Sequence, residues 1–307
     1  MIKNKNIVNE VLLSYPARKN QRGYLLQQEE ERLLQNSEYL EAVNLLSSLT
    51  LELQKADFDG DEIKSAELSA RLKEAKKSRD DLRRKLGFIP NVLPWECPLC
   101  KDEGEVNGAP CKCFYQKVTR ACYKELGVEE PSLCGFEDDT LSAAAGTKGY
   151  FDKLQKYCQT FKPTSKNIIL TGNTGTGKTF LAQAVTKKIS EDGKVCIFIP
   201  ATELNDVFVE MMYQPPIRQK EIFDVLTTCD FLVIDDLGAE RMLKNVTAQN
   251  LYALITERQN LSKPFMITTN LNLDEISLRY ADRLFSRLTG KNTATLGLVG
   301  KDLRKGV

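Results

Sequence analysis

The stretch Gly172-Asn173-Thr174-Gly175-Thr176-Gly177-Lys178-Thr179 has the pattern G-x-x-x-x-G-K-[ST] of a phosphate-binding loop. The apolar run Asn167–Leu170 before it indicates a buried strand, and Phe180–Val185 after it begins a helix with apolar residues at helical spacing. Glycines let the loop turn its N–H groups inward, where they and the helix N-terminus favour a polyphosphate. We expect Lys178 to contact the β- and γ-phosphates and the Thr179 hydroxyl to lie on Mg²⁺. The sequence therefore predicts a nucleoside triphosphate site.

Two acids supply the second part of this chemistry. The apolar run Phe231–Ile234 indicates a buried strand that ends at Asp235 and Asp236. The carboxyl ends of parallel strands lie beside the phosphate loop, so Asp235 could hold Mg²⁺ through water and Asp236 could orient or deprotonate the attacking water. Lys263–Asn270 predicts a further strand, and the Asn270 amide at its end could hydrogen-bond the γ-phosphate or the lytic water.

The fold class follows from the alternation of strands and helices after residue 167, which is typical of a parallel sheet with crossover helices. We expect a second strand at Lys194–Ile199 and a helix at Thr202–Met212, which Pro215-Pro216 would end. A later helix at Ser277–Leu288 carries three arginines one turn apart, so they share one stripe and are either solvated or presented to the nucleotide of a neighbouring subunit. These are Arg279, Arg283 and Arg287.

The amino-terminal part, from about Gln21 to Gly87, is highly charged and predicts helices. Two segments carry apolar residues at spacings of three and four, and the turn-forming stretch Ala56–Asp61 separates them. We therefore expect a helical hairpin packed as an antiparallel coiled coil. The apolar positions are Leu33, Leu40, Val43, Leu46, Leu49 and Leu53 in the first segment, and Leu68, Leu72, Ala75, Leu82 and Leu86 in the second.

Four cysteines have the spacing of a metal knuckle. Cys97 and Cys100 form a C-x-x-C pair, and Cys111 and Cys113 form a C-x-C pair about ten residues later. Together they offer four thiolates to one tetrahedral zinc, with turn residues for a short hairpin between the pairs. Four unligated thiols are the alternative. The remaining cysteines lack this spacing and are expected to be ordinary buried residues: Cys122, Cys134, Cys158, Cys196 and Cys229.

Length and composition limit the function classes. With 307 residues, the chain can form one α/β domain and a smaller appendage. Its 43 Lys and Arg residues nearly balance its 42 Asp and Glu residues, so any nucleic-acid contact must be local. A polar amino terminus and short apolar runs indicate a cytoplasmic protein without membrane contact. The chain has no histidine, which excludes a histidine base or metal ligand.

These motifs and their order resemble AAA+ ATPases of the DnaC/DnaI/IstB group, the bacterial helicase loaders and transposition helpers, over roughly residues 133 to 307. The helical amino-terminal part followed by a four-cysteine knuckle is similar to DnaI-like loaders. The resemblance divides the chain into a helical partner-binding region at 1–91, a zinc knuckle at 92–118 and an AAA+ domain at 119–307. The resembling motifs are Walker A at Gly172–Thr179, Walker B at Asp235–Gly238, sensor 1 at Thr268–Asn270, an arginine-finger box at Asp282–Leu288 and a sensor 2 remnant at Gly300–Arg304.

The resemblance implies ATP as the nucleotide and roles for three arginines. Arg287 is the first choice for the finger that enters the next protomer, Arg283 is the second, and Arg304 would touch the γ-phosphate in cis. It also implies an AAA+ sheet without a C-terminal helical lid. Walker B usually ends in Asp-Glu, so the shorter side chain of Asp236 predicts slow hydrolysis, with ATP serving as a switch.

The function implied by the resemblance is the loading of a replicative DNA helicase. ATP would drive self-association, the amino-terminal region would bind the helicase, and the sheet domain would contact single-stranded DNA. Val207–Lys220 is one candidate for that contact, and an ordinary amphipathic helix and loop is its alternative. An IstB-type transposition helper is the second function. Two other classes are further alternatives. A small-molecule kinase would need a lid whose arginines close over the phosphates. A protein adaptor stabilised by the metal site would bind ATP only for structural reasons.

Overall fold

The computed structural model describes residues 2–89, 93–138 and 148–299. The chain forms two compact units. The first, which we call the sheet unit, consists of Met1–Leu13 and Gly104–Val307, and the second, the helical unit, consists of Ser14–Glu103. No helix among the described residues is long and apolar enough to cross a membrane.

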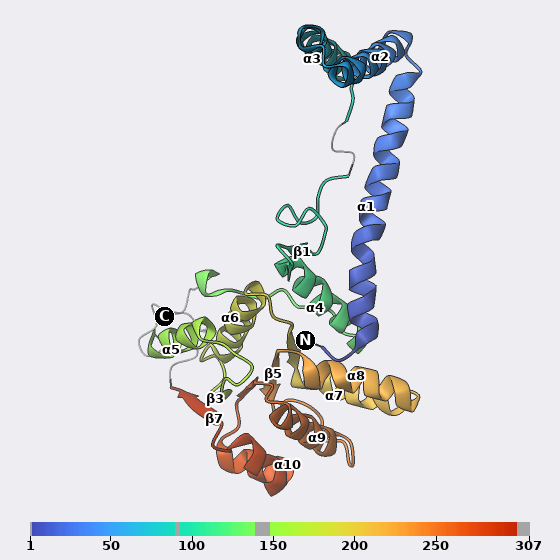
Figure 1. Ribbon diagram of the computed structural model, residues 1–307. Coiled ribbons are helices and arrows are strands. Elements are labelled where there is room, and N and C mark those ends of the chain that lie inside the picture. The colour runs from blue at the N-terminus through green and yellow to red at the C-terminus, as the bar shows by residue number, and fades with distance from the viewer. Residues whose placement is uncertain (1, 90–92, 139–147, 300–307) are drawn as a thin grey trace. The chain divides into compact units, whose positions relative to one another are not determined.

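The helical unit contains the predicted hairpin, but its first helix begins only at Ser37, so Leu33 belongs to the preceding helix, and Leu40 is exposed and does not join the predicted apolar seam. Helices α2 (Ser37–Asp59) and α3 (Glu62–Lys85) pack side by side (Figure 1) around Leu49, Ala56 and Leu68. Gly60 ends α2 at φ 74°, a left-handed conformation that glycine adopts without steric cost. The Asp61 carboxylate then accepts a hydrogen bond from the backbone N–H of Lys64 and begins α3.

Helix α1 (Lys5–Leu34) starts well before the predicted helical boundary near Gln21. Proline normally interrupts a helix because it lacks an N–H donor, yet Pro16 lies inside α1. The first residues of the chain belong to the sheet unit: Ile7 and Val11 are buried there, and the backbone N–H of Lys3 donates to Thr228 Oγ1 at 3.1 Å. Tertiary contacts therefore order a segment that the sequence pattern leaves unassigned.

The cysteine-bearing segment contains the predicted short hairpin. Strands β1 (Glu105–Val106) and β2 (Ala109–Pro110) pair antiparallel through a two-residue turn. Asn107 and Gly108 both have positive φ, 53° and 76°, as a type I′ turn requires. Helix α4 (Lys112–Leu126) follows directly.

The sheet is five-stranded, parallel and ordered β4-β5-β6-β3-β7, which confirms the predicted α/β fold class. The strand that enters the phosphate loop, β3, lies between the central strand β6 and the edge strand β7, so the loop opens next to the end of β6. Strand β7 has no counterpart in the sequence-based prediction. The strands are β3 (Asn167–Gly172), β4 (Cys196–Pro200), β5 (Phe231–Leu237), β6 (Phe265–Thr269) and β7 (Thr293–Leu298).

Helices cover the sheet (Figure 1), and one apolar cluster that includes Leu170, Val185 and Met266 joins strands to helix α6. The predicted interruption at Pro215-Pro216 is confirmed, because α7 ends at Met212 and α8 begins at Pro216. The helices are α5 (Lys148–Gln159), α6 (Lys178–Glu191), α7 (Ala201–Met212), α8 (Pro216–Thr228), α9 (Thr247–Asn260) and α10 (Leu273–Leu288), with a 3₁₀ turn at Phe136–Asp138.

Helix α4 protects the edge strand β4. The buried Tyr123 hydroxyl accepts a hydrogen bond from the backbone N–H of Phe198 at 2.8 Å and donates to the carbonyl of the same residue at 3.1 Å. An edge strand otherwise presents unpaired backbone groups. One tyrosine therefore replaces a neighbouring strand at this point of β4.

Candidate functional site

The phosphate loop has the backbone that its glycines predict. Gly172, Gly175 and Gly177 lie at φ 146°, 81° and 89°, and a Cβ added to Gly172 would come within 2.3 Å of the Leu298 carbonyl oxygen. Side chains are thus excluded where β7 passes the loop. Helix α6 begins at Lys178, so its N-terminus points its unpaired N–H groups into the loop.

Lys178 joins the loop to the end of β6. Its ammonium donates to the Gly172 and Asn173 carbonyl oxygens at 2.7 and 2.8 Å, and to Asn270 Oδ1 at 2.8 Å. The side chain is only 6% exposed, so the positive charge lies in a partly desolvated site where its attraction for phosphate is strong. The structure thus brings the predicted lysine and the predicted amide together.

Thr179 and Asp235 also meet. The Thr179 hydroxyl donates to Asp235 Oδ2 at 3.1 Å. Burial raises the pKa of Asp235, although hydrogen bonds from Thr268 and Thr179 oppose that rise. A hydroxyl and a desolvated carboxylate are oxygen ligands of the kind that Mg²⁺ binds, so this pair could hold the ion as the sequence predicts.

Asp236 and Asn270 face each other at the ends of β5 and β6. Asn270 Nδ2 donates to Asp236 Oδ1 at 2.6 Å, while its Oδ1 accepts from Lys178. The two bonds fix the orientation of the amide, since only its nitrogen can donate. Asp236 has φ 54°, which is uncommon for a residue with a Cβ. This chain of contacts connects the loop lysine to the second acid.

A cavity of about 760 Å³ opens beside the pair Thr179 and Asp235. It lies in the sheet unit between α4, α6 and α7, and its wall is rich in carboxylates. The acidic residues that line it are Glu129, Glu130, Glu203, Asp206, Glu210 and Asp235.

The three predicted arginines of helix α10 lie in different environments. Arg279 is partly buried and donates to the Glu240 carbonyl oxygen at 2.6 Å, so it joins α10 to the loop after β5. The buried Glu240 carboxylate also accepts a hydrogen bond from Tyr280. Arg283 and Arg287 are exposed to solvent. Arg304 lies outside the described residues.

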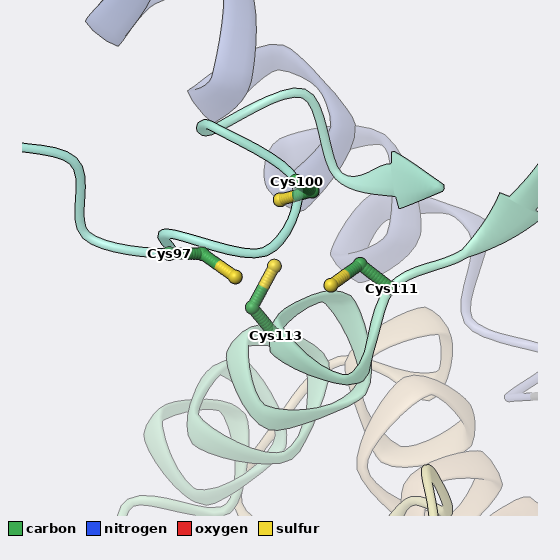
Figure 2. A group of neighbouring side chains, drawn as sticks. All are labelled: Cys97, Cys100, Cys111 and Cys113. Atoms are coloured by element: carbon green, nitrogen blue, oxygen red, sulfur yellow. The ribbon is translucent and has the colours of Figure 1, made fainter. Parts of the chain in front are cut away.

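The four knuckle cysteines converge. The ligand atoms of Cys97, Cys100, Cys111 and Cys113 all lie within 4.8 Å of one another, and Figure 2 shows their sulfur atoms turned toward a common centre. Zinc bound at about 2.3 Å by four sulfurs requires sulfur separations of about 3.8 Å, so small side-chain shifts would complete a tetrahedron. The donor set therefore fits a structural zinc and leaves no open position for catalysis.

The backbone supports this cluster. Asp102 is 2% exposed, has φ 58°, and accepts a hydrogen bond from the backbone N–H of Cys97 at 2.9 Å. Arg18 of α1 pairs with the same carboxylate at 3.0 Å. Such a network orders the turn between Cys97 and Cys100, and the sequence pattern alone does not reveal it.

Of the five remaining cysteines, four are buried as predicted, and burial raises the pKa of Cys158 to about 12. Cys134 is exposed, so the prediction that it is buried is wrong. It lies in the irregular segment before the 3₁₀ turn, where no regular element covers it.

The structure also places the stretch Val207–Lys220. Phe208 is 1% exposed and belongs to the core, so it cannot stack on a base. Arg218 pairs with Glu125 and Glu221 at 2.6 and 3.0 Å, whereas Tyr213 is 84% exposed. The amphipathic helix and loop, the alternative reading of this stretch, accounts for most of its side chains.

Comparison with known proteins agrees with the nucleotide site. Residues 152–289 match the family of IstB-like ATP binding proteins. The replicative helicase loader DnaC of Escherichia coli (strain K12) is 23% identical over 155 residues, which are 50% of this chain and 62% of that protein. The replicative helicase loader DnaI of Bacillus subtilis (strain 168) is 24% identical over 187 residues, 59% of this chain and 55% of that protein. The chain thus spans less than two thirds of either relative.

Among solved structures, a crystal structure of the DnaC helicase loader has 22% sequence identity and a TM-score of 0.47. The aligned region covers 54% of this chain and 96% of the chain in that crystal structure.

Proposed function

We propose that the protein is an ATP-dependent helicase loader in replication initiation, because residues 152–289 match the IstB-like ATP binding proteins and the chain is distantly homologous to DnaC and DnaI. ATP binding would switch self-association, and the assembled protein would deliver a replicative DNA helicase onto single-stranded DNA. Both relatives are replicative helicase loaders, which supports this choice.

One observation carries the ATP-dependent part of the proposal. Lys178, Asn270 and Asp236 form a continuous chain of hydrogen bonds beside the contact between Thr179 and Asp235. In this arrangement Lys178 would bind the β- and γ-phosphates, and Thr179 with Asp235 would hold Mg²⁺. Asp236 would orient the attacking water, and Asn270 would contact the γ-phosphate or that water.

Self-association requires groups that reach a neighbouring protomer. Arg287 is the first candidate and Arg283 the second, because both are exposed on α10 while Arg279 is bound to Glu240. A guanidinium from a neighbour would stabilise charge on the γ-phosphate. Slow hydrolysis follows from the short side chain of Asp236, so nucleotide occupancy, more than turnover, would control assembly.

The helical region within residues 1–91 is the proposed helicase-binding part, and the four-cysteine knuckle at 92–118 would bind zinc structurally. The tip of the α2–α3 hairpin offers large exposed apolar side chains, Phe58 at 92% and Ile63 at 85% exposure. Exposed apolar groups of this size are typical of protein contact sites. The AAA+ domain at 119–307 would contact single-stranded DNA.

Co-purification with a replicative helicase, with and without ATP, tests the proposal. We expect wild-type protein to retain the helicase in ATP and Lys178→Ala to lose both ATP binding and nucleotide-dependent self-association. The double variant Phe58→Ala, Ile63→Ala should keep ATP binding and lose the helicase. If the wild-type protein retains no helicase in ATP, the proposed loader role is wrong.

The family match favours one second function, an IstB-type transposition helper. Such a protein would bind duplex DNA and a transposase with the same nucleotide chemistry. Capture of a transposase with duplex DNA, and failure to capture a helicase, would make this the function.

A further inference from the structure

A single buried hydroxyl contacts both acids at the end of β5. Thr268 lies in β6 and is 1% exposed. Its Oγ1 donates to Asp235 Oδ1 at 2.6 Å and accepts a hydrogen bond from the backbone N–H of Asp236 at 2.8 Å. The direction of both bonds is fixed, because a backbone N–H can only donate and the hydroxyl has one proton.

The strand pairing explains why a side chain is needed here. Ile234 pairs with Ile267 and Leu237 pairs with Thr269, with a register shift between these pairs. Two residues of β5, Asp235 and Asp236, therefore lie opposite one residue of β6, which is the arrangement of a β-bulge. A bulge interrupts the backbone ladder, and the Thr268 hydroxyl supplies a bond at this interruption.

The same hydroxyl constrains each acid in a different way. Asp235 is held on both sides, through Oδ1 by Thr268 and through Oδ2 by Thr179, so its carboxylate cannot rotate without losing a bond. Asp236 is held through its backbone at φ 54°, and in this conformation its carboxylate meets Asn270. One residue outside the phosphate loop, Thr268, therefore helps to fix the orientation of both carboxylates.

We propose that Thr268 is a positioning residue for the acid pair, whose hydroxyl bridges the β5 bulge and directs Asp235 to the Mg²⁺ position beside Thr179. This inference rests on the proposed Mg²⁺·ATP binding. The hydrogen bonds of Thr268 described above involve neither Lys178 nor the loop backbone. Loss of the hydroxyl should therefore weaken the contribution of Mg²⁺ to ATP affinity and leave the contribution of the loop.

The test measures ATP affinity of the full chain by calorimetry, in Mg²⁺ and in EDTA, and takes the ratio of the two dissociation constants. We call this ratio, the dissociation constant in EDTA divided by that in Mg²⁺, the Mg²⁺-dependent gain in affinity. Thr268→Val keeps the side-chain shape without the hydroxyl. We expect it to lower the gain about 10- to 100-fold, which corresponds to the free energy of one hydrogen bond to a charged group. Affinity in EDTA should be unchanged. Thr268→Ser retains a hydroxyl at this position and should therefore retain the Mg²⁺-dependent gain in affinity.

Thr269→Val is the matched control. Thr269 is the next residue of β6 and is fully buried, and its hydroxyl donates to the Leu237 carbonyl oxygen at 2.6 Å without touching either carboxylate. We expect this variant to lower stability and to leave the Mg²⁺-dependent gain intact. If Thr268→Val fails to fold, Thr268→Ala takes its place in the same comparison.

Three results would overturn the inference while the wild-type protein still binds Mg²⁺·ATP. They are an unchanged gain in Thr268→Val, an equal loss in Thr269→Val, and loss of the fold in both Thr268→Val and Thr268→Ala, which would assign the hydroxyl a structural role. Absence of ATP binding by the wild-type protein would instead refute the proposed function, and this inference with it.

Discussion

Replacing Tyr123 by phenylalanine tests whether helix α4 stabilises the edge of the sheet. The change removes one oxygen and leaves the ring in place, so the packing of the buried side chain is kept. It also removes the hydroxyl that is the shared hydrogen-bond partner of the backbone N–H and carbonyl of Phe198, at 2.8 and 3.1 Å. Burial raises the pKa of Tyr123, so the hydroxyl stays protonated and can donate at any ordinary pH.

The magnitude follows from the two backbone groups that lose their partner. A buried polar group left without a hydrogen bond costs about 1 to 3 kcal/mol, so Tyr123→Phe should lower the free energy of unfolding by about 2 kcal/mol or more. For a domain of this size, that loss corresponds to a fall of about 4 to 8 °C in melting temperature. Thermal unfolding followed by circular dichroism measures it.

Tyr157→Phe is the control for this experiment. Its hydroxyl donates to the Lys166 carbonyl oxygen at 2.9 Å, in an exposed position where water can replace it. We expect a change below about 0.5 kcal/mol in this variant. A melting temperature of Tyr123→Phe equal to that of Tyr157→Phe would show that the edge of β4 does not depend on α4, and our account of this contact would be wrong.

Three further predictions concern a buried cation, the cysteine cluster and an ion pair. Arg258 is fully buried and donates to three carbonyl oxygens, so Arg258→Met should cost about 3 kcal/mol or more in urea unfolding. Metal analysis should find one zinc per chain, lost in Cys113→Ser and retained in Cys134→Ser, which lies outside the cluster. Burial alone would raise the pKa of Asp230, but Lys263 at 2.8 Å holds it below its ordinary value. The pair therefore stabilises the fold above about pH 4 and loses this effect as pH falls through the lowered pKa, so the deficit of Asp230→Asn, about 1 to 2 kcal/mol at pH 7, should shrink in acid.

Local patterns were sufficient for much of the nucleotide site. The glycines of the phosphate loop predicted its positive φ values, and the apolar run before Asp235 predicted a buried strand with acids at its end. Turn residues predicted the break between α2 and α3 and the hairpin at Asn107 and Gly108. These features depend on residues close in sequence, because steric limits on φ and the period of side-chain burial act within a few positions.

Contacts between segments distant in the sequence determine the features that local patterns do not predict. The sequence places Thr268 in a strand, but only the register shift between β5 and β6 puts its hydroxyl between Asp235 and Asp236, more than thirty residues away. Likewise, only the packing of α4 on β4 gives Tyr123 its role. A short-range pattern carries no record of strand register or of which helix covers an edge, since both are set by the burial of the whole unit. Short-range patterns in the sequence therefore identify the residues of the predicted nucleotide site, and the tertiary fold sets the orientation of their side chains.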